Sequence, residues 1–173
     1  MSKIQLKKEL QKLTKEQLIE QIIELYDTHK PVKEYYKAFL NPVRILEQFE
    51  NYKAMIVNKF NPDKISRNMR TYFPVGKKAV ADFSALKPPP GLLADLMVTL
   101  VENACQLSGD WGDMPEQHYN NTVNSFERAL KFLRKEGLLD DFRPRCLKCL
   151  KKAIKCGGGF SDGMYAVYDD YYQ

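Results

Sequence analysis

Three of the four cysteines lie in the stretch CLKCLKKAIKCGGGF (146–160), and thiols at this density can bind zinc or carry redox chemistry. Cys146, Cys149 and Cys156 are spaced at i, i+3 and i+10, so they share one face of a helix with Ala153. Thiols spread along one helix cannot converge on a single ion, and no strand precedes them as a thioredoxin-like motif requires. The spacing therefore predicts cysteines that line the core as small hydrophobic side chains, and no metal or other cofactor is expected.

An acidic group with one histidine is the second set of residues that could do chemistry. Carboxylates beside a histidine can hold a divalent cation for hydrolysis. The DWGD sequence fits no calcium loop, and the histidine is not in a Glu-x-x-His pair. A metal-dependent hydrolase is therefore kept only as a weak alternative, and we expect no catalytic residues and no enzyme activity. The metal-ligating set in that alternative is Glu102, Asp110, Asp113, Glu116 and His118.

A basic segment with adjacent aromatic residues is the third set. Between residues 53 and 78 there are seven Lys or Arg and one acid, whereas residues 95–127 carry six carboxylates and no Lys or Arg. Basic groups beside aromatic rings suit phosphate neutralisation and base stacking, so weakly sequence-selective binding of nucleic acid or another polyanion is an alternative function. Solvated surface charge is the favoured explanation of the pattern, because most runs of charge are solvated surface. The residues that would bind are Lys64, Arg67, Arg70, Tyr72, Lys77 and Lys78.

The elements that must position these residues all show the helical period. Thr14 and Gln17 have capping-box spacing ahead of an amphipathic stripe, Asn41 is a candidate cap, and Gly137 has the pattern of a helix C-cap. The apolar stretch at 92–107 predicts a central buried helix, and 63–74 reads mostly as loop. The pattern predicts an all-α fold, an irregular array or bundle of seven to eight helices of the kind with which an α-solenoid begins. We expect one domain, with a helix pair at 1–40 packing on a body at 41–173.

Composition sets the broad class of the protein. The chain has 173 residues, 44% of them hydrophobic, with a net charge of +5, which suffices for a folded core without disulfides. No apolar run has the length of a signal peptide or a membrane span, so we expect a cytoplasmic protein without membrane partners.

Four stretches together resemble a known family. They are LTKEQLIEQIIELYDTHKPVKEYYKAFLNP (13–42), VGKKAVADFSAL (75–86), LLADLMVTLVENACQLSGDWGD (92–113) and RPRCLKCLKKAIKCGGGFSDGM (143–164). The chain resembles a bacterial family known as domain of unknown function 6155, and the resemblance covers nearly its whole length. It implies a single-domain bacterial cytoplasmic protein and assigns no activity, cofactor or site residue. The residues themselves favour a non-catalytic helical interaction module with a protein partner.

Overall fold

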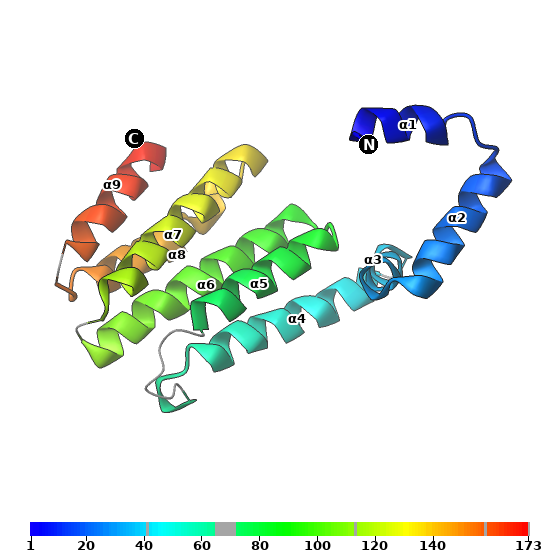
Figure 1. Cartoon of the computed structure of the whole chain (residues 1–173). Helices are drawn as coiled ribbons and strands as arrows, with labels where there is room; N and C mark the ends of the chain where they lie inside the picture. The colour runs from blue at the N-terminus through cyan, green and yellow to red at the C-terminus, as the bar shows by residue number, and fades with distance from the viewer. Residues whose placement is uncertain (41, 65–71, 113, 158, 173) are drawn as a thin grey trace. The chain divides into compact units, whose positions relative to one another are not determined.

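The computed structural model describes residues 1–40, 42–64, 72–112, 114–157 and 159–172 (Figure 1). Within these residues the chain is all-helical, as the sequence predicts, with nine α-helices and one 3₁₀ turn rather than the seven to eight helices expected. None of the described helices is both long and apolar enough to cross a lipid bilayer. The elements are α1 (Lys3–Leu10), α2 (Lys15–Thr28), α3 (Lys30–Leu40), α4 (Pro42–Lys59), η1 (Pro62–Lys64), α5 (Tyr72–Ala85), α6 (Pro90–Trp111), α7 (Glu116–Glu136), α8 (Leu139–Ala153) and α9 (Phe160–Tyr172).

Local sequence signals set several helix ends. Thr14 and Gln17 form the predicted capping box, in which each side chain bonds the backbone N–H of the other residue. Gly137 ends α7 in the left-handed conformation, with φ of 71°, and the Leu138 N–H bonds the Leu133 carbonyl at 2.8 Å. Both predictions are confirmed. Each of these helix ends depends on residues close together in the sequence, so the sequence alone could predict it. The predicted cap at Asn41 lies outside the described residues.

Three helices differ from what the sequence predicts. Pro31 and the aromatic residues after it predict only a short turn from the sequence, whereas the chain forms a complete helix there, α3. The start of α5 is Tyr72, inside the predicted loop, because Tyr72 and Phe73 pack on Phe60 with ring centroids 5.0 and 5.3 Å apart. Helix α8 begins at Leu139, ahead of the cysteine stripe, and continues through Pro144 because burial of side chains on the following turns offsets the lost backbone hydrogen bond.

The chain divides into two compact units, which we call unit 1 (Met1–Ile45) and unit 2 (Leu46–Gln173). In unit 1, α2 packs against α3, and no residue of α1 or α2 is buried. The expected packing of residues 1–40 on the rest of the chain stays a prediction.

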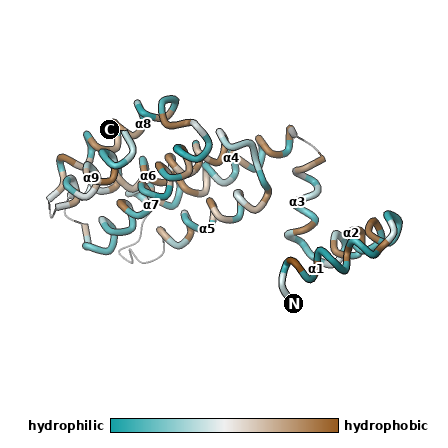
Figure 2. The backbone as a smooth tube through the Cα atoms, turned by 90° about the horizontal axis from the view of Figure 1, so that it is seen from above, coloured by the Kyte–Doolittle hydropathy of each residue, from teal (hydrophilic) through white to brown (hydrophobic). Residues whose placement is uncertain are grey.

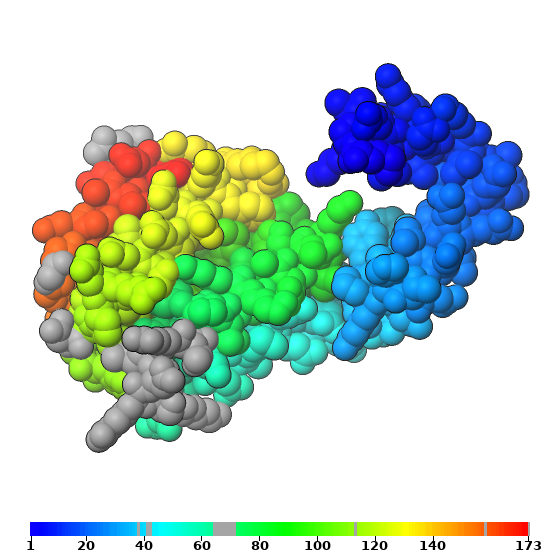
Figure 3. Space-filling model, viewed as in Figure 1, coloured from blue at the N-terminus to red at the C-terminus, as the bar shows by residue number. Residues whose placement is uncertain are grey.

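Unit 2 is built around α6, as the apolar stretch predicts. Helix α6 contacts α5, α7 and α8, while α9 packs on α7 and α8 (Figure 1). The space-filling view shows α5, α6 and α7 packed against one another across one face (Figure 3). Buried α6 residues form the middle of the core: Leu93, Ala94, Leu96, Val98, Thr99, Leu100, Val101, Ala104, Cys105, Leu107 and Ser108. Helix α6 is therefore the common neighbour of α5, α7 and α8.

Candidate functional site

His118 lies in the core of unit 2 and is fully hydrogen-bonded there. Its Nδ1 is 2.7 Å from the Tyr72 hydroxyl, and its Nε2 is 2.8 Å from Ser108 Oγ and 3.2 Å from the Ala104 carbonyl oxygen. A carbonyl oxygen only accepts, so Nε2 carries the proton and Nδ1 accepts one from Tyr72. Burial lowers the pKa of His118 to about 4 and raises that of Tyr72 to about 12. The group is therefore neutral, and it ties α5, α6 and α7 together.

The Ser108–His118 pair has the distance of a serine nucleophile and its base, but its geometry does not support that chemistry. The imidazole atom facing Ser108 is the protonated Nε2, which cannot take a proton from the hydroxyl. Ser108 has no exposed surface, and its hydroxyl donates to the Ala104 carbonyl at 3.1 Å. A Tyr72 hydroxyl also stands where a triad has a carboxylate. The arrangement is that of a satisfied polar core.

Arg145 joins α8 to α6 through a half-buried ion-pair network. Its guanidinium holds Glu102 through two bonds, at 2.6 and 2.9 Å, and reaches Asp95 at 3.1 Å. Lys53 of α4 contacts Asp95 at 3.1 Å from the other side. The bonds to Glu102 raise the pKa of Arg145 further above its usual value. The network fixes α4, α6 and α8 relative to one another.

The cysteines behave as the helical spacing predicts, with one exception. Cys146 and Cys149 are buried with Ala153 on the core side of α8, whereas Cys156 is only partly buried. Burial raises the pKa of Cys146, and a bond to the Cys105 thiol together with burial raises that of Cys149. Thiols held protonated in this way are poor nucleophiles.

The residues of the predicted metal set do not share a site in the described chain. Glu102 bonds Arg145 and His118 bonds Tyr72, while Asp110 accepts a hydrogen bond from Gln106 at 2.6 Å. Glu116 is exposed at the start of α7, and Asp113 lies outside the described residues. Among the residues that the structure describes, no three His, Cys, Asp or Glu are grouped to hold a metal ion.

The predicted polyanion-binding set is only partly described. Arg67 and Arg70 lie outside the described residues, and of Lys64 only the backbone, in η1, is described. Tyr72 is 3% exposed and offers no ring face for base stacking. Lys78 pairs with Asp82 at 2.8 Å on the surface of α5, whereas Lys77, half-buried, lines a pocket. Nucleic-acid binding through the complete set stays a prediction.

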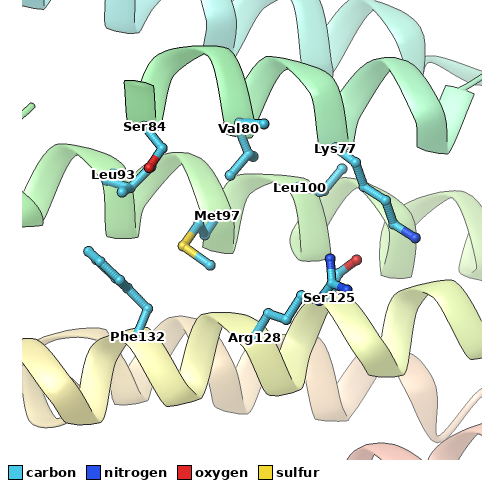
Figure 4. A pocket seen from close by; sticks show the side chains of 10 residues that line it. Lys77, Val80, Ser84, Leu93, Met97, Leu100, Ser125, Arg128 and Phe132 are labelled. Carbon is cyan, nitrogen blue, oxygen red and sulfur yellow. The ribbon is translucent and has the colours of Figure 1, made fainter. Parts of the chain in front are cut away.

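The pocket beside Lys77 is the feature that sequence reasoning missed. It has a volume of about 290 Å³ and lies between α5, α6 and α7 (Figure 4). Figure 4 shows Lys77, Ser125 and Arg128 at one end, and Leu93 and Phe132 at the other. Burial and the positive charge of Arg128 lower the pKa of Lys77. Lys77 and Arg128 are 51 residues apart, and no spacing rule joins positions on two separate helices.

A second feature, in unit 1, is an apolar stripe left exposed on α2. Ile19, Ile22, Ile23 and Leu25 are 38–54% exposed, and Figure 2 shows hydrophobic positions recurring among hydrophilic ones along this helix. Lone exposed apolar residues are common, but side chains at i, i+3 and i+4 form a continuous strip. The sequence shows the stripe, but it could not show that the other helices of unit 1 leave it exposed.

Comparison with known proteins agrees with the resemblance of the four stretches. No curated protein and no solved structure matches the chain. One family model, described as a family of unknown function, matches residues 1–171 and so covers both units. The chain therefore belongs to the family of unknown function DUF6155.

Proposed function

We propose that the chain is a helical protein-interaction module without chemistry of its own, and that α1 and α2 of unit 1 form its binding face. The exposed stripe of Ile19, Ile22, Ile23 and Leu25 carries this proposal. Isolated helices of fewer than about 15 residues are marginal in water, and α2 has 14 residues, none of them buried. A partner that covers the stripe therefore stabilises α2 as well as binding it.

Charge complementarity favours a second copy of the same chain as the occupant. Residues 1–14 carry four lysines and one glutamate, whereas residues 15–28 carry one lysine and four acids. In a two-fold symmetric pair, α1 of each copy can lie along α2 of the other, so both contacts join opposite charges. The acids Glu16, Glu20 and Asp27 fall beside Ile19 and Ile23 at helical spacing, so the charged strip borders the apolar one.

Light scattering on a size-exclusion column tests self-association directly. We expect the wild-type chain to have twice the mass of a single copy at micromolar concentration, and to dissociate more readily in high salt because salt screens the α1–α2 attraction. The double variant Ile19→Ser, Ile23→Ser should be monomeric. The matched control is Leu147→Ser, Ile154→Ser, which removes two comparably exposed apolar side chains of unit 2 and should leave the dimer intact.

Charge reversal identifies the two helices as each other's partners. Glu20→Lys with Glu24→Lys makes α2 basic, and Lys7→Glu with Lys8→Glu makes α1 acidic, so each variant alone should be monomeric. An equimolar mixture should restore a dimer containing one copy of each, because every α1–α2 contact then joins opposite charges.

Three results would overturn the proposal. A wild-type chain that stays at the mass of one copy excludes self-association. A dimer that survives Ile19→Ser, Ile23→Ser does not use the stripe. A mixture of the two charge variants that remains monomeric shows that α1 and α2 do not pair between copies.

A further inference from the structure

The pocket of unit 2 has walls and a size that suit one small molecule. Its middle and one end are apolar, formed by Val80 of α5, Leu93, Met97 and Leu100 of α6, and Phe132 of α7. The volume of about 290 Å³ is at the lower limit of small-molecule pockets, which run from about 300 to 1,000 Å³. At about 30 Å³ for each water-sized group, it holds roughly ten non-hydrogen atoms.

The other end of the pocket concentrates positive charge without a carboxylate to neutralise it. Lys77 Nζ donates to Asn121 Oδ1 at 2.6 Å and lies 5.5 Å from the centre of the Phe73 ring, both neutral partners. Arg128 stands beside it, and among the described residues neither cation forms an ion pair. Burial lowers the pKa of Lys77, and the positive charge of Arg128 lowers it further. An anion placed between them relieves this repulsion and forms charge-assisted hydrogen bonds.

We propose that this pocket binds an amphipathic anion, whose carboxylate or phosphate head group lies between Lys77 and Arg128 and whose short hydrocarbon tail runs past Met97 toward Leu93 and Phe132. A carboxylate with a tail of about seven carbons has roughly ten non-hydrogen atoms and fits the volume. The charge fixes the orientation, because the tail end of the pocket has no ionisable side chain. The assignment concerns unit 2 alone and does not depend on self-association through unit 1.

Isothermal titration calorimetry with four probes tests the assignment. Octanoate and octyl phosphate carry the two candidate head groups on chains of eight carbons, octanol removes the charge, and acetate removes the tail. We expect saturable binding of at least one of the two anions at one site per chain. Octanol and acetate should each bind at least about tenfold more weakly, because octanol lacks the charged head group and acetate lacks the tail.

Three variants place the binding in this pocket. Arg128→Gln should raise the dissociation constant of the anion about tenfold, and Lys131→Gln, which removes the same charge from an exposed position on α7 outside the pocket, should leave it unchanged. Ser84 is exposed at the tail end, so Ser84→Phe can fold and should block the tail whatever the head group.

The preferred anion distinguishes the head group: tighter octanoate indicates a carboxylate, and tighter octyl phosphate a phosphate. The assignment fails if neither anion binds saturably, or if octanol binds as tightly as both. It also fails if Arg128→Gln and Lys131→Gln weaken binding equally, because the charge effect would then be one of net charge rather than of this site.

Discussion

Lowering the pH should destabilise unit 2 through His118 in a predictable window. The unfolded histidine has its usual pKa of 6.5, whereas burial lowers the folded value to about 4. Below pH 6.5 the unfolded chain therefore binds a proton that the folded chain does not, so the stability present above pH 6.5 is lost as the pH falls toward 4. The two pKa values give a loss of about 2 kcal/mol at pH 5, and of about 3 kcal/mol once the pH is below both.

Urea unfolding at pH 8 and pH 5 measures this loss, with the single tryptophan, Trp111 on α6, as a reporter of unit 2. Carboxylates also begin to titrate near pH 5, so the comparison is between chains. His118→Gln is less stable at pH 8, because it disturbs a buried network, but it should lose about 2 kcal/mol less than the wild type between the two pH values. His29→Gln, which changes the other, exposed histidine, should behave as the wild type does.

The reasoning is refuted if His118→Gln and the wild-type chain lose the same stability on going from pH 8 to pH 5. It is equally refuted if His29→Gln removes the loss, because the titrating group would then be the exposed histidine. A change of slope in the urea transition would show that the unfolded state had changed, so the comparison is made at a common slope.

Other outcomes are expected from packing, charge and thiol burial in unit 2. Gly76→Ala places a Cβ 2.6 Å from a leucine methyl of α6 and should reduce the free energy of unfolding by about 1–3 kcal/mol. Gly91→Ala meets no atom within 4 Å and should increase the free energy of unfolding by about 0.4–1 kcal/mol. Urea midpoints measure both changes. Arg145→Met leaves its carboxylate partners without their cation and should destabilise unit 2 by about 2 kcal/mol. The same substitution should cost less in a Glu102→Gln background, and a double-mutant cycle measures the difference. A thiol reagent should modify Cys156 first in the native chain and the buried thiols only after unfolding, as mass spectrometry of timed samples detects.

The sequence predicts those parts of the fold that depend on neighbouring residues. Thr14 and Gln17, or Gly137 and Leu138, act within one turn of backbone, and both helix ends form as expected. The start of α5 could not be predicted in this way, because it depends on the packing of Tyr72 and Phe73 against Phe60, which directly follows α4. Tertiary contacts there override a segment with little helical periodicity.

Residue type predicted the candidate chemistry less well, because the partner decides what a polar side chain does. Glu102 appeared in the sequence as a potential metal ligand, yet it bonds Arg145, 43 positions away. Tyr72 appeared as a stacking residue beside cations, yet its hydroxyl donates a hydrogen bond to His118 in the core. Both pairings join helices that are distant in sequence, so the spacing of residues within one helix cannot predict them.

Side chains whose hydrogen bonds are complete within the fold contribute to stability, whereas side chains left without such partners are available to bind a second molecule. His118 and Arg145 have reached partners that use their hydrogen-bonding capacity, so changing them should alter stability. Lys77 and Arg128 lie together at one end of an apolar pocket, and Ile19 and Ile23 face water, so each pair has free energy to gain from a second molecule. Substitutions at the first kind of position should move the urea midpoint, and Arg128→Gln or Ile19→Ser, Ile23→Ser should change binding with the core of unit 2 intact. The pKa of His118 is therefore tested by urea unfolding, and the exposed stripe of α2 by self-association. The result of one measurement does not predict the result of the other.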